Sequence, residues 1–197
     1  MGEPLSDAAL DTIFRTARTY NGYTDQPVTE TEIRRIYDLL KMGPTSANQQ
    51  PARFVWCLSQ AARDKLADCA TGTNPDKIRK APAAVVIGMD ENFHEHLPFL
   101  FPHTDARSWF EGDLAKRREN AFRNSSLQGA YLLIAARAIG LDTGPMSGFD
   151  PDAVAAAFFA DTPDVRPNFI ATLGHGDPST IFARSPRPDF ERFNRID

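Results

Sequence analysis

Apolar residues recur along the chain with the periods of helices and strands, and the clearest pattern lies over residues 29–42. The apolar side chains that share one helical face there are Ile33, Ile36, Tyr37 and Leu40. Thr29 and Glu32 have the spacing of a capping box, and Gly43-Pro44 follows as a stop signal. These residues predict an amphipathic helix over 29–42.

Helices and strands follow one another irregularly over the rest of the chain. We expect further helices over residues 7–18, 60–70 and 119–139 and a short one after Asp150, and strands over 54–58, 83–89 and 169–173. The run at 83–89 is almost continuously apolar, which is typical of a strand buried on both faces. The second half of the 119–139 helix is also nearly all apolar, which indicates burial or a subunit interface. Because strands and helices do not alternate evenly, the pattern predicts an α+β fold rather than a doubly wound sheet.

Three segments have no regular period. Residues 90–117 are rich in aromatic side chains, histidine and proline, and we expect them to form a packed loop or lid. Residues 141–149 are expected to be an irregular Gly/Pro segment, and residues 177–197 an extended arm. No Gly/Ser-rich linker divides the chain, so we expect a single domain over residues 1–197.

Composition and charge narrow the possible functions. The 197 residues are 42% hydrophobic and carry a formal net charge of −4, which argues against a nucleic-acid-binding surface. The sequence contains no apolar run long enough to span a membrane and no apolar leader. With two cysteines, these features predict a cytoplasmic protein. The sequence contains neither of the glycine-rich phosphate-binding motifs of nucleotide enzymes. No residues have the spacing of metal ligands, so we expect no metal site.

Two polar segments and a few arginines carry the candidate chemistry. Residues 43–51 supply hydroxyl and amide groups, which suit a polyol or the edge of a heterocycle. Residues 144–150 contain two glycines, which allow the backbone to approach a planar ligand. Each segment is also compatible with an ordinary turn or connection. Arg18, Arg184 and Arg187 have forked donor sets that match phosphate, although single exposed arginines are common.

Together these segments give the chain a family resemblance. Four stretches come in the order seen in the FMN-dependent nitroreductase family, namely residues 18–23, 43–51, 141–150 and the arm with Arg184 and Arg187. Three stretches, residues 43–48, 100–110 and 122–126, further resemble members that reduce malonic semialdehyde in bacterial uracil (pyrimidine) degradation. The resemblance implies a nitroreductase-like α+β fold with a central, mostly antiparallel sheet flanked by helices. It also implies a homodimer that exchanges the C-terminal arm.

The resemblance assigns FMN contacts to three segments and the arm. The implied contacts are Arg18, Thr19 and Asn21; Pro44, Thr45, Ser46, Asn48 and Gln50; Pro145, Met146, Ser147 and Gly148; and Arg184 and Arg187. The second group would reach the flavin from the partner subunit, and backbone N–H groups near Ser147 and Gly148 would face flavin N5. Because Ala17 and Asn21 replace basic residues of the family pattern, we expect phosphate binding to depend more on Arg184 and Arg187.

The resemblance implies an oxidoreductase that works by a ping-pong scheme. NADH or NADPH would reduce the flavin and leave, and a small acceptor would then take the hydride in the same pocket. The acceptor expected first is malonic semialdehyde, which would give 3-hydroxypropionate. A broad nitro- or quinone-reducing enzyme is the alternative. A flavin-binding or carrier protein without turnover also fits, because the sequence shows no obvious catalytic acid or nucleophile.

His103 and Arg107 are the candidate catalytic residues, and both lie in the aromatic segment. A substrate carboxylate needs a cation beside it, and the alkoxide that forms on an aldehyde needs a proton. The sequence also allows Arg107 to form an ion pair with a nearby acid, for which Asp105, Glu111 and Asp113 are the candidates.

Overall fold

A four-stranded antiparallel sheet forms the centre of the computed structural model, which describes residues 2–197. The strands are β1 (Ala52–Cys57), β2 (Ala83–Asp90), β3 (Asp142–Met146) and β4 (Val165–Gly174), in the order β1-β2-β4-β3. Every neighbouring pair is antiparallel, with one register shift at Ile87/Gly88. The expected α+β fold with an antiparallel sheet is therefore confirmed.

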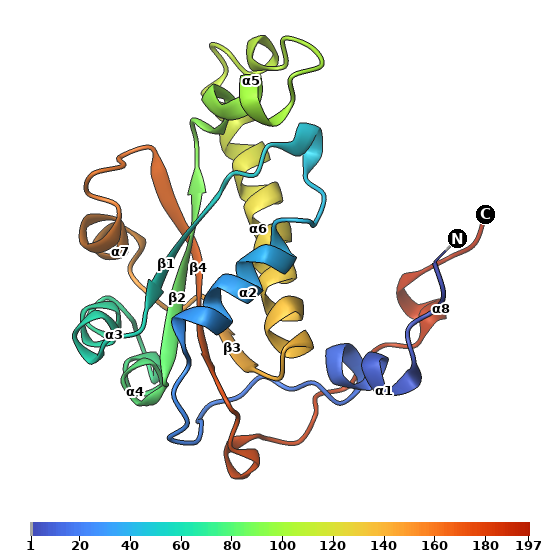
Figure 1. Cartoon of the computed structure of the whole chain (residues 1–197), viewed down its shortest axis with the longest axis vertical. Helices are drawn as coiled ribbons and strands as arrows, with labels where there is room; N and C mark the ends of the chain where they lie inside the picture. The colour runs from blue at the N-terminus through green and yellow to red at the C-terminus, as the bar shows by residue number, and fades with distance from the viewer. Residues whose placement is uncertain (1) are drawn as a thin grey trace.

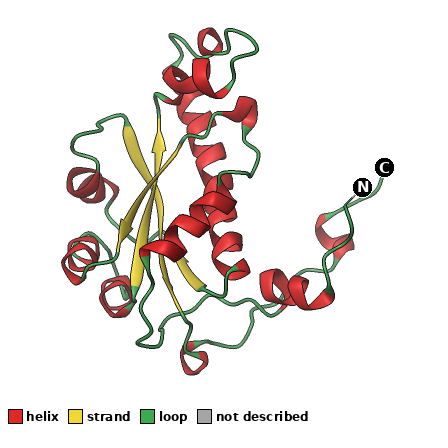
Figure 2. Cartoon of the chain, viewed as in Figure 1, coloured by secondary structure: helices red, strands yellow, loops and turns green. Residues whose placement is uncertain are grey.

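Helices cover both faces of this sheet (Figures 1 and 2). They are α1 (Asp7–Leu10), α2 (Glu30–Leu40), α3 (Gln60–Ala67), α4 (Asn74–Lys80), α5 (Leu97–Leu100), α6 (Leu114–Ala138), α7 (Pro151–Phe158) and α8 (Phe190–Phe193). Helices α2 and α6 lie on one face, and α3, α4 and α7 lie on the other. Each face has its own apolar core, so alternate side chains of β2 are buried on opposite sides.

The helix predicted over 29–42 is α2, and its start follows the sequence signal. The Thr29 hydroxyl accepts a hydrogen bond from the Glu32 backbone N–H, and the Glu32 carboxylate accepts one from the Thr29 N–H. Ile33, Ile36 and Leu40 are buried against α6 and the sheet, whereas Tyr37 of the same predicted face is exposed. The capping box and the apolar stripe therefore fix this helix as expected.

The helix expected over 7–18 is shorter, with α1 followed by a π-helix over Asp11–Arg15. Three further elements differ from the sequence-based expectation. Residues 142–146, expected to be irregular, form the edge strand β3, where Pro145 is tolerated because an edge strand need not donate on both sides. Helix α6 begins at Leu114 instead of residue 119, since Asp113 caps it by accepting from the Lys116 backbone N–H. Helix α4 had no predicted counterpart, because its seven residues bury just one apolar side chain, Ile78.

The aromatic segment between β2 and α6 is folded into short helices and not into one long loop. Phe93 and Leu97 are fully buried with Phe110 and Ala121 in a third apolar core. The Phe93 and Phe110 rings meet edge to face with centroids 5.0 Å apart. The segment is thus a packed projection beyond the end of the sheet (Figure 1).

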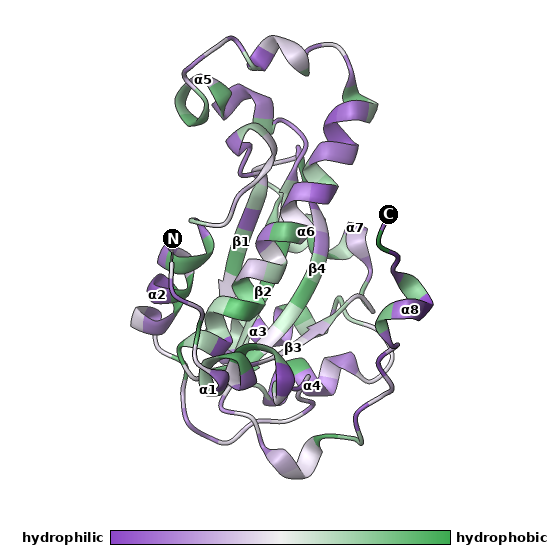
Figure 3. Ribbon diagram, turned by 90° about the vertical axis from the view of Figure 1, so that its right-hand side faces the viewer, coloured by the Kyte–Doolittle hydropathy of each residue, from purple (hydrophilic) through white to green (hydrophobic). Residues whose placement is uncertain are grey.

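Helix α6 changes character along its length, as Figure 3 shows. Its first turns are mostly hydrophilic, and its later turns are more hydrophobic and pack on the sheet. Leu132, Ala135 and Ala136 are buried there, whereas Phe122 and Leu127 are exposed on the outer side.

Both chain ends project away from the sheet in Figure 1, and the turned view of Figure 3 shows that the ends themselves lie apart. The arm after residue 177 is mainly extended, apart from one short turn and α8. Within residues 2–197, no helix is both long and apolar enough to cross a membrane.

Candidate functional site

A basic cavity of about 440 Å³ lies between the N-terminal segment and the C-terminal arm. Its lining includes Phe14, Ala17, Arg18, Thr19, Asn21, Arg137, Phe182, Ala183, Arg184, Ser185 and Arg187. Five of the predicted cofactor residues therefore lie together here, namely Arg18, Thr19, Asn21, Arg184 and Arg187. Four of the lining side chains are arginines and none is acidic, so the cavity favours an anion.

Hydrogen bonds from the arginines join the arm to the N-terminal segment. Arg18 donates to the Phe182 carbonyl, and Arg184 donates to the carbonyls of Arg15 and Ala17 at 3.0 and 2.9 Å. Thr19 pairs with Thr143 at the edge of the sheet. The cavity is therefore assembled from segments far apart in sequence and is fixed directly to the start of β3.

Arg137, in the last turn of α6, is a site residue that the sequence reasoning missed. Its Nη1 donates to the Ile13 carbonyl at 3.1 Å, and its buried Nε has no hydrogen-bond partner within residues 2–197. Burial lowers the pKa of this guanidinium, and nearby Asp142 opposes that shift. A basic residue at a helix C-terminus is usual, so the sequence pattern alone does not indicate that this one faces a cavity.

The polar segment over residues 43–51 is held by one face of α6. The hydrogen-bonding residues of that face are Asn120, Asn124, Gln128 and Tyr131, spaced by three or four positions. Asn124 accepts from the Ser46 backbone N–H at 2.8 Å, and the Tyr131 hydroxyl donates to the Pro44 carbonyl at 2.9 Å. Gln128 accepts from the Ala52 N–H at 2.8 Å. Side chains of α6 therefore hold the backbone of this segment in place.

Three residues of this segment have left-handed backbone conformations. Ala47, Asn48 and Gln50 have φ values of 47°, 48° and 44°. Such conformations cost ~1–3 kcal/mol each in residues with a Cβ, and they persist where surrounding contacts impose them. The side chains of Asn48 and Gln50 are hydrogen-bonded to each other, and Asn48 also donates to the Leu100 carbonyl at 2.8 Å. The segment is therefore a preformed surface and not a relaxed turn.

Replacing Asn124 with leucine should destabilise the protein by about 2–4 kcal/mol, since each buried polar group left without a partner costs ~1–3 kcal/mol. The change leaves both the Ser46 N–H and the Gln49 side-chain carbonyl without the amide that now pairs with them. Urea unfolding measures the loss. The same substitution at exposed Asn194 should cost less than ~0.5 kcal/mol, and equal losses at the two positions would contradict the anchoring described here.

The predicted ring-facing residues lie at the end of β3 and in the turn that follows. Pro145 and Met146 end the strand, and Ser147 is exposed. The Gly148 carbonyl accepts from the Thr71 N–H and the Asn74 side chain. Outside the strands and within residues 2–197, the N–H groups of Ser147 and Gly148 donate to no backbone carbonyl. These donors are therefore available to a ligand.

A second cavity, of about 480 Å³, adjoins the polar segment on another part of the molecule. Its lining includes Tyr37, Lys41, Met42, Asn48, Gln50, Ala52, Arg53, Phe54, His96, Phe99, Leu100 and Gln128. Of the predicted cofactor residues, Asn48 and Gln50 line it, and Pro44, Thr45 and Ser46 precede them in the same segment. One chain therefore does not bring the polar segment to the basic cavity (Figure 1).

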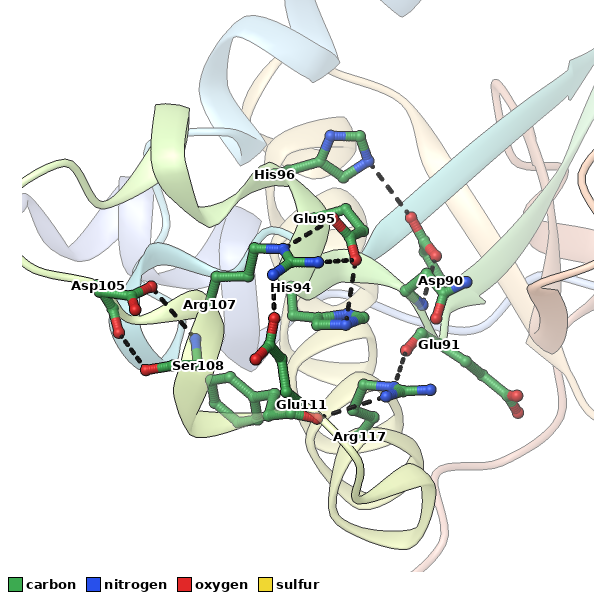
Figure 4. A network of polar contacts seen from close by, with 12 residues as sticks. Asp90, Glu91, His94, Glu95, His96, Asp105, Arg107, Ser108, Glu111 and Arg117 are labelled. Atoms are coloured by element: carbon green, nitrogen blue, oxygen red, sulfur yellow. Dashed lines mark hydrogen bonds and ion pairs between the residues drawn. The ribbon is translucent and has the colours of Figure 1, made fainter.

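His103 and Arg107 line neither of these two cavities. Arg107 donates to Glu95 through Nε and Nη2 at 2.8 and 2.9 Å and to Glu111 through Nη1, as Figure 4 shows. The hydrogen bonds that Arg107 donates to the Glu95 carboxylate raise the pKa of the guanidinium. His103 is exposed, with its ring edge to face against Phe101. Of the three acids that the sequence offered as ion-pair partners of Arg107, Glu111 forms such a pair. Glu95, which the sequence did not suggest, forms a second one. The catalytic role of both residues stays a prediction.

Within residues 2–197, no group of three or more His, Cys, Asp or Glu side chains is arranged to hold a metal ion.

Comparison with known proteins decides the family. The family model described as "Nitroreductase family" matches residues 14–175, which include the basic cavity's N-terminal wall, the polar segment and β3. The chain belongs to the nitroreductase family. The family expected from the sequence is therefore confirmed.

Full-length relatives in this family are similar along their whole chains. A Stenotrophomonas maltophilia (strain K279a) protein, named as an NADH dehydrogenase/NAD(P)H nitroreductase, is 54% identical over 196 residues and is covered completely, as is this chain. A Burkholderia lata protein of the same description is 56% identical over 193 residues, with 98% of each chain covered.

Solved nitroreductase structures share the fold at low identity. A nitroreductase from Exiguobacterium sibiricum 255-15, solved in complex with FMN, superposes with a TM-score of 0.85 at 19% identity and full coverage of both chains. An NAD(P)H:FMN oxidoreductase from Staphylococcus epidermidis superposes with a TM-score of 0.84 at 17% identity, covering 100% of this chain and 99% of the other.

Proposed function

We propose that this nitroreductase-family protein is an FMN-dependent NAD(P)H oxidoreductase that reduces small acceptors in the cytoplasm. The observation that carries the proposal is the cavity with four arginines and no acidic side chain, joined to the start of β3. The names of the relatives, which specify NADH or NAD(P)H, and the FMN bound by a structural neighbour support it. The expectation of FMN with NADH or NADPH agrees with these findings.

The residues present fit the phosphate and sugar chain of FMN. Phosphate matches the forked donors of Arg18, Arg184 and Arg187. Arg137 adds a fourth cation, and its buried Nε without a partner is the kind of group that a bound anion satisfies. Thr19 and Asn21 supply the neutral polar groups that a ribityl chain needs.

Bound FMN would supply hydride transfer between the nicotinamide and the acceptor. The chain's own residues would position the cofactor. The arginines would hold the phosphate end, and the N–H groups of Ser147 and Gly148, in the turn after β3, would be the donors for the ring. The backbone between them is rigid, because Thr143 lies within the sheet and Gly144 packs against the Tyr20 carbonyl. Holding groups in a fixed geometry is how a protein accelerates a reaction whose chemistry belongs to its cofactor.

We propose further that the working unit is a homodimer in which the polar segment over residues 43–51 covers the flavin held by the partner subunit. A second copy is needed because one chain keeps this segment away from the basic cavity. Large apolar side chains lie exposed beside the segment and on α6, including Met42 at 78%, Phe99 at 85% and Phe122 at 56%. Burying these side chains in a symmetric interface would remove apolar surface from water and so stabilise the dimer relative to the monomer. The arm also exposes Phe182 and Phe193, which suits its exchange between subunits.

The acceptor we propose is malonic semialdehyde, reduced to 3-hydroxypropionate. Support comes from the resemblance of residues 100–110 and 122–126 to family members with this activity. A broad nitro- or quinone-reducing activity is the second candidate, favoured by the relatives' names, and a carrier that binds flavin without turnover is the third.

Parallel kinetics on malonic semialdehyde, a nitroaromatic and a quinone separate these candidates. With NADH or NADPH as donor, we expect the aldehyde acid to have the highest kcat/KM. Brisk nitro reduction beside negligible aldehyde reduction would instead make this a broad nitroreductase. Flavin that stays oxidised with NADH and NADPH would indicate the carrier.

A further inference from the structure

The second cavity is lined by basic but not by acidic side chains. Its basic lining residues are Lys41, Arg53 and His96, and no acidic side chain lines it. Lys41 pairs with the exposed carboxylate of Asp38 at 2.5 Å. The carboxylate beside Arg53 and His96 is Asp90, at the end of β2, whose side chain is 9% exposed. Arg53 therefore lines the cavity while the carboxylate that pairs with it is buried.

Arg53 is held rigidly at the wall of this cavity. Its Nη2 donates to Asp90 Oδ2 at 2.5 Å, and its Nη1 donates to the carbonyls of Gln50 and Ala52, both at 3.0 Å. Asp90 is itself fixed, because its Oδ1 accepts from the Asn92 N–H at 2.8 Å. One third of the Arg53 side chain remains exposed. The guanidinium is thus positioned by the protein before any ligand arrives.

His96 lies on the other side of the same buried carboxylate. Its Nε2 is 3.6 Å from Asp90 Oδ2, and its side chain is 55% exposed toward the cavity. Figure 4 shows the ring facing Asp90. Arg53 and His96 therefore flank one anion and present their remaining donors toward the same space.

We propose that Arg53 and His96 form a subsite for the carboxylate of the acceptor. A planar carboxylate matches the forked donors of an arginine, and a neighbouring imidazole N–H supplies a further hydrogen bond. The inference rests on the proposed function, because Asn48 and Gln50 on the same wall are the residues expected to meet the partner's flavin. It gives the cavity a preference for short aldehyde acids over neutral aldehydes.

This assignment differs from the one expected for Arg107. The three guanidinium nitrogens of Arg107 already donate to Glu95 and Glu111, so a substrate carboxylate would have to displace a protein carboxylate there. Arg53 pairs with one protein carboxylate, through Nη2, while Nη1 donates to two backbone carbonyls. Within residues 2–197 its Nε donates to no protein group, and a third of the side chain is exposed. One protein carboxylate competes with a substrate at Arg53 and two compete at Arg107, which favours Arg53.

The first test compares acceptors that differ by the carboxylate, with the enzyme loaded with FMN. The double variant Arg53→Gln/Asp90→Asn removes the ion pair as a unit, so no unpaired buried charge remains. We expect it to raise KM for malonic semialdehyde about 10–100-fold, the value of a hydrogen bond to a charged group, while KM for propanal stays within about twofold. His96→Gln should raise the same KM by a smaller factor, and Arg79→Gln, at a partly exposed arginine of α4, should change neither.

A second measurement keeps the subsite testable whichever acceptor is physiological. Malonate cannot accept a hydride, and its binding to the FMN-loaded protein can be followed by calorimetry. We expect wild-type protein and Arg79→Gln to bind malonate alike, and Arg53→Gln/Asp90→Asn and Arg53→Lys to bind it at least tenfold more weakly. Malonate binding that depends on Arg53 while malonic semialdehyde is not reduced would sustain the subsite and overturn the proposed acceptor. Unchanged malonate binding in both Arg53 variants, or loss in Arg107→Gln instead, would overturn the subsite.

Discussion

Replacing both Arg184 and Arg187 with glutamine should raise the dissociation constant for FMN by about 100-fold or more. Both side chains line the four-arginine cavity. A hydrogen bond to a charged group is worth ~1.5–3 kcal/mol, so the loss of two corresponds to a factor of roughly 10²–10⁴. Titration of the apoprotein, followed by the quenching of flavin fluorescence, measures the change. Riboflavin, which has no phosphate, should bind with little difference between wild type and variant.

The arm itself offers a matched control for this prediction. Arg192→Gln/Arg195→Gln removes the same two charges from the same segment. Arg192 lies over the Phe193 ring and Arg195 pairs with Asp197, both outside the cavity. We expect the control pair to leave the dissociation constant for FMN within about twofold. Equal weakening by the two pairs would show a general effect of net charge and would remove the phosphate assignment.

Replacing Gly144 with alanine should destabilise the protein by about 3 kcal/mol, the upper range for overpacking a well-filled site, and should also abolish flavin retention. A Cβ at Gly144 would lie 2.6 Å from the Tyr20 backbone oxygen and 2.6 Å from the Thr172 hydroxyl. The backbone oxygen cannot turn away, so the N-terminal segment would have to leave the edge of β3. Because that segment carries Arg18 and Thr19, the cavity would open.

The comparison variant is Gly148→Ala, four residues further along the same segment. Its Cβ would approach the Asn74 side-chain amide at 2.6 Å, and this end of a flexible side chain can rotate. We expect its stability to change by less than about 1 kcal/mol. Urea unfolding of the two apoproteins measures both values. Similar losses in the two variants would contradict the close packing of β3 on the N-terminal segment.

Sequence pattern predicted the elements whose signals are local. The capping box of α2 and the continuous apolar run of β2 are properties of a few adjacent residues, and both elements formed where expected. Strand β3 was missed because Gly144 and Pro145 disfavour a strand by propensity. Pairing with β4 and the packing of Tyr20 against Gly144 outweigh that propensity, and neither contact can be read from residues 141–149 alone.

The residues of the candidate site that belong to family motifs could be predicted from the sequence. Family resemblance named Arg18, Arg184 and Arg187, which the fold brings into one cavity. Arg137 was not foreseen, because its role depends on where α6 ends relative to the arm. Arg53 was not foreseen either, since its position depends on the pairing of β1 with β2, which places Asp90 within reach. Long-range packing determines where both side chains lie, and sequence periodicity does not encode such packing.

The visible absorption spectrum of the purified protein, recorded before and after anaerobic addition of NADH and then NADPH, tests the central claim most directly. If this chain is an FMN-dependent oxidoreductase, the protein reconstituted with FMN shows flavin absorption bands, and these bleach when one of the two nucleotides is added. Protein that takes up no FMN, or whose bound flavin stays oxidised with both nucleotides, would contradict the proposed function. The family and the fold would then stand without the reductase activity.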